Sequence, residues 1–177
     1  MKYVPALLLV FLFSCKEKKQ DSASAPALPS APADFFSFSK ADSINPVLLP
    51  DSASFLCPVW NKHIHWAAKD VFNPAVVIRN DTLFLLYRAE DTIGKYAGTS
   101  RIGLAWSLDG LHFTKHPMPV LYPDHDAQKV YEWEGGCEDP RIVQDEKGMY
   151  CMTYTAYDGD KARMLVATST DLYHWTK

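Results

Sequence analysis

An internal repeat is the feature of this sequence that most restricts its fold. The segment AWSLDGLHFTK (105–115) matches ATSTDLYHWTK (167–177), with Ala, Ser, Asp, His, Thr and Lys at corresponding places and Trp in place of Phe. Upstream, NPAVVI (73–78) matches DPRIVQ (139–144), and YRAED (87–91) matches YTAYD (154–158). The offset varies only between 62 and 67 residues, which indicates two copies of one unit whose loops differ in length.

Each copy contains four short strand-like segments, rich in β-branched and aromatic residues and separated by Gly, Asp and Asn turns. No segment has a convincing helical pattern. Four-stranded repeats of this size are typical of β-propeller blades. The sequence therefore predicts an all-β fold with about two four-stranded blades between residues 52 and 177. The expected strands are AVVIR (75–79), TLFLLYRA (82–89), RIGLAWS (101–107) and LHFTK (111–115), then RIV (141–143), MYCMTYTAY (149–157), ARMLVATS (162–169) and YHWTK (173–177).

The number of blades sets an expectation about the length of the protein. A blade cannot bury its faces alone, and propellers have at least four blades. At about 60 residues per blade, closure needs roughly 250–300 residues, whereas the chain has 177. We therefore expect an incomplete propeller that is the N-terminal portion of a longer protein.

Residues 1–15, MKYVPALLLVFLFSC, have the form of a bacterial lipoprotein signal peptide. A basic start precedes an apolar run, Val4 to Phe13, that is too short to span a membrane as a stable helix. Leu-Phe-Ser-Cys resembles the lipoprotein cleavage box, with Cys15 as the lipidated residue; an ordinary secretory signal with a chance cysteine is the alternative. Residues 16–51 are rich in Ala, Ser and Pro and are expected to be a disordered tether. These features predict a lipid-anchored protein of a bacterial cell envelope.

Charge and cysteine content exclude other classes of site. The net charge of −3 gives no basic face for nucleic acid. After Cys15, three cysteines remain, Cys57, Cys137 and Cys151, an odd number without metal-ligand spacing, which favours buried free thiols. His63 and His65 share one strand face, but no third ligand accompanies them, so no metal site is predicted.

The stretch EWEGGCEDPR leads into the first strand of the second blade. In propellers the first strand of each blade lines the central channel, so this loop is expected to face the axial pocket. Pro140 is expected to hold Asp139 in an extended conformation, with Glu138 and Asp139 on opposite sides of the strand. Asn73-Pro74 occupies the corresponding position in the first blade, which predicts an amide beside the Asp139 carboxylate. On spacing alone, a polar turn without a catalytic role is the commoner explanation.

From about residue 73 to residue 177 the chain resembles glycoside hydrolase family 130, the β-mannoside phosphorylases and β-mannosidases. The segments that carry the resemblance are NPA (73–75), LLYRAED (85–91), SRIGLAWSLDG (100–110), GGCEDPR (135–141) and ARMLVATSTDLYHWTK (162–177). Their order and spacing together are more specific than any one of them. The resemblance implies a five-bladed propeller and an enzyme that cleaves β-linked mannosides with inversion of configuration.

The resemblance also implies roles for individual residues. Asp139 matches the family's proton-donating aspartate in its Glu-Asp-Pro-Arg motif, which is thought to act through a sugar hydroxyl. Asn73, Arg88 and Arg101 match positions that line the mannose subsite, and Asp91 in the YRAED segment is a further candidate for substrate binding. From the residues alone, an ion pair between Arg88 and Asp91 explains these two side chains as well as substrate contact does.

Several alternatives stay open. An inverting displacement needs either phosphate or activated water as its nucleophile, and the envelope location favours water. No cofactor is expected; inorganic phosphate is the co-substrate if the enzyme is a phosphorylase, and a mannose-containing oligosaccharide is the expected partner. The rival functions are a five-bladed arabinan- or fructan-cleaving glycosidase and a non-catalytic glycan-binding lipoprotein. The sequence does not predict the oligomeric state.

Overall fold

The structure, a computed structural model, describes residues 39–177. The expectations for the signal peptide, for Cys15 and for residues 16–38 of the tether lie outside the described residues. Within them, regular structure is β except for one short helix, α1 (Lys129–Glu132), in a region where no helix was expected. None of the described helical residues belongs to a helix long and apolar enough to cross a membrane.

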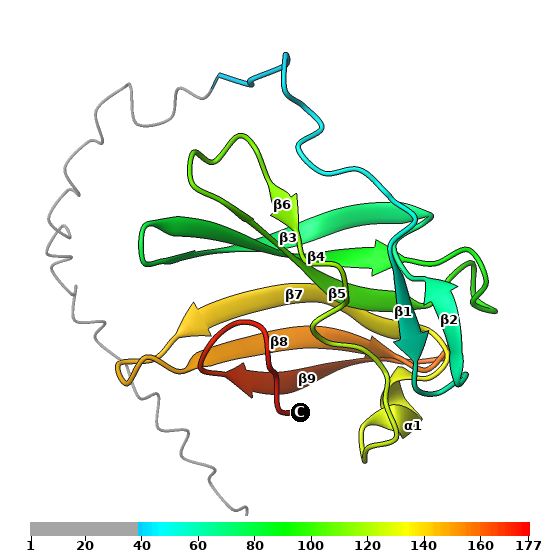
Figure 1. The fold of residues 1–177 in the computed structure, drawn as a ribbon. Coiled ribbons are helices and arrows are strands. Elements are labelled where there is room, and N and C mark those ends of the chain that lie inside the picture. The colour runs from blue at the N-terminus through cyan, green and yellow to red at the C-terminus, as the bar shows by residue number, and fades with distance from the viewer. Residues whose placement is uncertain (1–38) are drawn as a thin grey trace, which may run out of the picture. The chain divides into compact units, whose positions relative to one another are not determined.

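The strands form a small hairpin and one larger sheet (Figure 1). β1 and β2 pair as the antiparallel hairpin, and the sheet has the order β3-β4-β5-β7-β8-β9, with β6 paired to β5. The strand bounds are β1 Ser54–Cys57, β2 Lys62–His65, β3 Asp70–Arg79, β4 Thr82–Glu90, β5 Ser100–Ser107, β6 Thr114–Lys115, β7 Gly136–Gln144, β8 Tyr150–Tyr157 and β9 Ala162–Ser169.

The larger sheet consists of two antiparallel groups that meet at one point. Strands β3 to β6 form the first group and β7 to β9 the second, drawn in green and in yellow to brown in Figure 1. Between β5 and β7, the paired residues are Ser100 and Gly136, in a parallel arrangement. Thr176 bridges Thr168 where a fourth strand of the second group is expected. The predicted all-β fold with two blades is confirmed.

The outermost strand of each blade is shorter than predicted. Asp109 accepts hydrogen bonds from the backbone N–H groups of Leu111 and His112 at 2.8 and 2.9 Å, and Asp171 does the same for the two residues at the corresponding places, both at 2.8 Å. An aspartate side chain that binds the backbone two and three residues ahead stabilises a turn. Each blade therefore begins its expected fourth strand with this turn, and pairing starts only at Thr114 and Thr176.

Two apolar clusters form the core of the described residues, and the larger one joins the blades. The larger one lies between the blades and includes Leu86, Ile102, Leu104, Met152 and Tyr154. Almost every residue of β5 is buried, whereas β8 alternates buried and half-buried positions because only one of its faces is covered. Burial of each large apolar side chain contributes about 1.5–3 kcal/mol. The smaller cluster lies beneath the β1–β2 hairpin and is made of Phe55, Cys57, Ile64, Trp66, Ala67, Tyr87, Ala89 and Ala105.

Ordered contacts begin before Ser52, where the folded part was expected to start. The backbone N–H of Asp51 donates to the carbonyl of Ala67 at 3.0 Å, and the Asp51 carboxylate pairs with Lys115. Leu48 packs against the smaller apolar cluster. The last residues of the predicted tether therefore belong to the fold, because Leu48 supplies apolar surface that the Ala/Ser/Pro-rich part lacks.

Gly136 is the position where the blades leave no room for a side chain. Its φ is +118°, and an added Cβ would lie 2.1 Å from the carbonyl oxygen of Ser100. We expect Gly136→Ala to lower the free energy of unfolding by about 3 kcal/mol or more, because both the backbone conformation and the blade contact must change. Denaturant unfolding of the complete gene product measures the loss.

Gly148→Ala is the matched control for this substitution. Gly148 also has a positive φ, +85°, but the nearest atom to an added Cβ is Gln144 Nε2 at 3.8 Å. Its expected cost is about 1–2 kcal/mol, from the left-handed backbone alone. Equal losses for the two variants would contradict a close contact between the blades at Gly136.

Candidate active site

Asn73 and Asp139 occupy matching bulges on two neighbouring inner strands. The pairing of β3 with β4 shifts register at Asn73-Pro74, and the pairing of β7 with β8 shifts at Asp139-Pro140. The residue before proline has a positive φ in both bulges, +49° at Asn73 and +48° at Asp139. Bulges re-aim side chains and are frequent next to active sites. Here they direct the two side chains toward each other, and Asn73 Nδ2 donates to Asp139 Oδ1 at 2.8 Å.

The extended conformation predicted for Asp139 is therefore wrong, whereas the amide beside its carboxylate is confirmed. Proline restricts the preceding residue chiefly by excluding the right-handed helical region. Asn and Asp enter the left-handed region more easily than most residues, so the bulge takes that conformation. As a consequence, Glu138 and Asp139 do not face opposite sides, and both reach Arg88.

Arg88 of β4 is the centre of the site. Its Nη2 lies 2.6 Å from Glu90 Oε1 and 2.9 Å from Glu138 Oε1. Its Nη1 lies 3.4 Å from Asp139 Oδ1, a longer contact. Strand alternation explains why Glu90 participates, since residues two apart on a strand face the same side. One guanidinium thus contacts three carboxylates that come from both blades.

Two neighbours fix the plane of the Arg88 guanidinium. Ser100 Oγ accepts a hydrogen bond from Arg88 Nε at 3.0 Å and lies 3.2 Å from Glu138 Oε1, to which it donates. The ring of Phe72 lies beneath the guanidinium, 4.7 Å from its central carbon. The Arg88 side chain is only 17% exposed. It is therefore held from its edge and from one face.

Lys69 adds a second cation at the far side of Glu90. Its Nζ lies 2.7 Å from Glu90 Oε2 and 2.6 Å from the carbonyl oxygen of Ala97, and 3.8 Å from Asp70. Glu90 thus accepts from Lys69 with one oxygen and from Arg88 with the other. Neither Lys69, Glu90 nor Ser100 was singled out from the sequence; the spacing of Arg88 and Glu90 was the signal for Glu90.

The two glutamates that share Arg88 have pKa values shifted in opposite directions. Burial raises the pKa of Glu90, but the hydrogen bonds and charges of Lys69 and Arg88 outweigh it and hold the pKa below its ordinary value. Burial also raises the pKa of Glu138, and there the charge of Arg88 does not compensate, so the pKa stays raised. Glu138 therefore resists ionisation although it lies beside a cation.

Two predicted subsite residues, Asp91 and Arg101, form no hydrogen bond or ion pair with Arg88, Glu138 or Asp139. They pair with each other at 2.7 Å, with side chains 1% and 0% exposed. The other carboxylate oxygen of Asp91 accepts backbone N–H groups of Ile93, Gly94 and Thr99. The pair therefore braces the loop between β4 and β5, and in this structure neither side chain offers a polar atom to a ligand at the surface.

The alternative ion pair between Arg88 and Asp91 is wrong. Arg88 pairs with Glu90, and Asp91 pairs with Arg101 on the other side of the strand. Two residues of one strand share a face when they are an even number of positions apart. Arg88 and Asp91 are three apart, so alternation separates them.

The cysteines of residues 39–177 are free thiols. Cys57 and Cys137 are buried free thiols, as predicted, and Cys151 is a free thiol that is partly exposed. His65 Nδ1 contacts the carbonyl oxygen of Ser52 at 2.6 Å. No group of three or more His, Cys, Asp or Glu in the described part of the chain is arranged to hold a metal ion.

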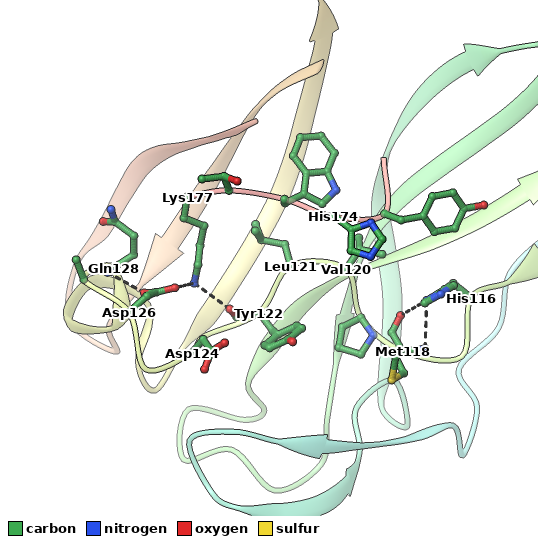
Figure 2. A pocket seen from close by; sticks show the side chains of 15 residues that line it. His116, Met118, Val120, Leu121, Tyr122, Asp124, Asp126, Gln128, His174 and Lys177 are labelled. Carbon is green, nitrogen blue, oxygen red and sulfur yellow. Dashed lines mark hydrogen bonds and ion pairs between the residues drawn. The ribbon is translucent and has the colours of Figure 1, made fainter. Parts of the chain in front are cut away.

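A cavity of about 670 Å³, drawn in Figure 2, has no residue of the Asp139 cluster in its lining. It lies between the segment 116–128 and the segment 173–177. Its cation, Lys177, is already bound to Asp126 and Glu132, each at 2.7 Å. We place the candidate site at Asp139 instead, since there a partly exposed carboxylate of the second blade meets the side-chain donors Asn73 and Arg88 of the first blade.

The opposite pKa shifts of Glu90 and Glu138 generate a prediction about stability. Glu90→Gln is expected to lower the free energy of unfolding by about 1–3 kcal/mol at neutral pH, because it removes a charged partner of Lys69 and Arg88. The loss shrinks as pH falls through the lowered pKa of Glu90 in the wild-type protein, where the carboxylate becomes protonated.

Glu138→Gln, the same change on the other side of Arg88 Nη2, is expected to cause no such loss at neutral pH. A raised pKa in the folded protein means that the carboxyl group contributes stability at low pH and loses it as pH rises through that pKa. Thermal unfolding of both variants of the complete gene product between acid and neutral pH measures the difference. An equal loss for both at neutral pH would contradict the assignment of the shifts.

The comparisons with known proteins agree in the family that they identify. The family model of glycoside hydrolase family 130, described as beta-1,4-mannooligosaccharide phosphorylase, matches residues 57–177. A curated 1,2-beta-oligomannan phosphorylase of Thermoanaerobacter sp. (strain X514) is 34% identical over 143 residues, which cover 76% of this chain and 42% of that protein. A beta-1,2-mannobiose phosphorylase of the same organism is 33% identical over 126 residues.

Solved structures give the same result. The crystal structure of a glycosyl hydrolase from Bacteroides ovatus is 45% identical, with a TM-score of 0.76, and covers 80% of this chain and 40% of its own. A structure described with GH130 glycoside hydrolases that target beta-1,2 mannosidic linkages in Candida mannan is 44% identical, with a TM-score of 0.76 and the same coverage. These relatives are five-bladed β-propellers, of which the two blades form a section. The chain spans about two fifths of the length of these relatives.

Proposed function

We propose, on the premise that this chain belongs to glycoside hydrolase family 130, that it is part of an enzyme that cleaves β-linked mannosides with Asp139 as the proton donor. The observation that carries the proposal is the convergence of Asn73 and Arg88 on one oxygen of Asp139. The second oxygen, Oδ2, accepts no hydrogen bond from the described residues, and the side chain is 35% exposed. That oxygen is therefore available to carry a proton and to meet a sugar.

The geometry suits one side of an inverting displacement. A protonated Asp139 donates its proton to a sugar hydroxyl, as the family resemblance implies, while the nucleophile attacks the anomeric carbon from the opposite face. Asn73 Nδ2 holds Oδ1 as an acceptor, which leaves the proton on Oδ2. The Arg88 guanidinium and the Asn73 amide also present donors of the kind that bind sugar hydroxyls.

Asp139→Asn tests the assignment of the acid. We expect kcat on a β-mannoside to fall by about 10²–10⁴, since a general acid contributes that much, while the sugar is still bound because the amide keeps the shape of the side chain. Product formation and calorimetric binding with the complete gene product measure the two effects. Asp81→Asn, the same change at an exposed turn between β3 and β4, is the control. Full turnover by Asp139→Asn would contradict the proposal and favour a glycan-binding protein.

The bond that is cleaved is proposed to be a β-1,2-mannosidic linkage, and the nucleophile is proposed to be water. Both curated relatives are described by β-1,2-linked substrates, and the structure that is 44% identical is described with hydrolases of β-1,2 linkages. The lipoprotein-type signal with Cys15 supports an envelope location, where phosphorolysis would release sugar phosphate away from metabolism. No cofactor is needed for hydrolysis, and phosphate is the co-substrate only if the enzyme is a phosphorylase.

Analysis of the products decides between water and phosphate. The complete gene product is incubated with β-1,2- and β-1,4-mannobiose, with and without inorganic phosphate, and the released sugars are identified by NMR. We expect free mannose from the β-1,2-linked disaccharide whether or not phosphate is present. Mannose 1-phosphate formed only in the presence of phosphate would contradict hydrolysis, and faster cleavage of the β-1,4-linked disaccharide would contradict the linkage.

A further inference from the structure

The Arg88 guanidinium contacts its three carboxylates at unequal distances. Nη2 contacts Glu90 at 2.6 Å and Glu138 at 2.9 Å, whereas Nη1 approaches Asp139 only to 3.4 Å. We propose that Glu90 and Glu138 are positioning residues that hold Arg88 on their side of the site, so that Asp139 is able to carry a proton at the working pH of the enzyme. This inference rests on the proposed role of Asp139 as the acid.

An arginine that paired fully with Asp139 would disable it as an acid. Arginine and carboxylate groups commonly pair through two parallel hydrogen bonds, which would occupy both oxygens of Asp139. An opposite charge at such a distance also lowers the pKa of an aspartate by about 1–3 units. An acid that is ionised at the working pH has no proton to give. Arg88 is therefore compatible with a proton-donating Asp139 only if its charge is mainly paired with other carboxylates.

Glu90 and Glu138 are the carboxylates that pair with Arg88. Lys69 and Arg88 carry two positive charges, and Glu90 and Glu138 carry two negative charges when ionised. When both glutamates are ionised, the four charges balance one another, so an ionised Asp139 would share Arg88 with two other carboxylates. The Glu90 and Glu138 side chains are 11% and 13% exposed, which strengthens their contacts with Arg88 relative to exposed pairs.

Neighbouring strands leave the guanidinium little freedom to turn toward Asp139. Ser100 of β5 accepts from Arg88 Nε at 3.0 Å, and the ring of Phe72 covers one face of the guanidinium. The nearby Arg141 is not a second cation for Asp139, since its Nη1 donates to the carbonyl of Pro140 at 2.7 Å. The charged and titratable groups around Asp139 are Lys69 before β3, Asp70 at the start of β3, Arg88 and Glu90 on β4, and Glu138 on β7.

Glu138 is also costly to the fold, which supports a functional reason for its presence. Burial raises the pKa of Glu138 above its ordinary value despite the neighbouring Arg88. A neutral side chain at this place would avoid that cost. Groups with such perturbed pKa values are concentrated at functional sites, and a role in restraining Arg88 explains why an ionisable group is present here.

The pH dependence of kcat/KM tests the inference, because its alkaline limb reports the pKa of the acid in the free enzyme. Removal of either glutamate frees Arg88 to approach Asp139 and removes a negative charge beside it; both effects stabilise the ionised aspartate. We therefore expect Glu90→Gln and Glu138→Gln to move the alkaline limb to lower pH by about one unit or more. Each is measured in the complete gene product on the mannobiose that it cleaves, with thermal unfolding as the check of folding.

Glu134→Gln is the matched control. Glu134 lies at the same end of the blades, and its carboxylate accepts the backbone N–H of Lys95 at 2.9 Å rather than contacting Arg88. Loss of this charge is expected to leave the alkaline limb within a few tenths of a pH unit of its wild-type position. A shift as large as that of Glu90→Gln would show that any lost charge has the same effect, and would overturn the inference.

Failure of this inference is distinguishable from failure of the proposed function. Suppose that Asp139→Asn is inactive, and that Glu90→Gln and Glu138→Gln fold and have the alkaline limb of kcat/KM at its wild-type pH. Asp139 then remains the acid, and the positioning role is overturned. If Asp139→Asn retains turnover, both proposals are overturned. Should Glu90→Gln fail to fold, Glu138→Gln decides alone, since its substitution is expected to preserve stability.

Discussion

The contact between the two blades at Ser100 and Gly136 is the constraint on which the site depends. The backbone N–H of Ser100 donates to the carbonyl of Gly135 at 2.8 Å, which fixes the start of β7 against the start of β5. The hydroxyl of the same Ser100 contacts both Arg88 and Glu138. One residue therefore joins the backbones of the two blades and the side chains of the cluster. A glycine at position 136 is what permits this approach, since a Cβ there would overlap Ser100.

Duplication of one structural unit explains how an amide and an acid come to face each other. Asn73-Pro74 and Asp139-Pro140 are the same position of the repeat, with the same bulge and nearly the same backbone angle. Because inner strands of successive blades lie side by side, the two re-aimed side chains meet. A difference of one functional group, amide in one blade and carboxyl in the next, then produces a donor beside an acid without any change of the fold.

The repeat made much of this architecture predictable from the sequence. Matching segments of similar length located the two blades, and the equivalence of Asn73 with Asp139 predicted their contact. The backbone at Asp139 was not predictable in the same way, because the rule for residues before proline does not include the bulge that the neighbouring strand imposes. The conclusion that Glu138 and Asp139 face apart failed for the same reason.

The partners of Arg88 show a different limit of sequence reasoning. Strand alternation alone places Glu90 beside Arg88 and Asp91 on the opposite side, so this part was available from the spacing. The burial of Asp91 with Arg101 required knowledge of the loop that Asp91 holds through three backbone N–H groups. Likewise, Lys69 and Ser100 lie far from Glu138 in sequence, and only the packing of the blades brings these groups together.

A crystal structure of the complete gene product with β-1,2-mannobiose bound, in the Asp139→Asn background, tests the central claim most directly. The account predicts a mannose unit at the inner ends of the blades, with a hydroxyl group within hydrogen-bond distance of the substituted side chain and donors from Asn73 and Arg88 nearby. A disaccharide bound instead in the cavity between residues 116–128 and 173–177, with the Asp139 cluster empty, would contradict it.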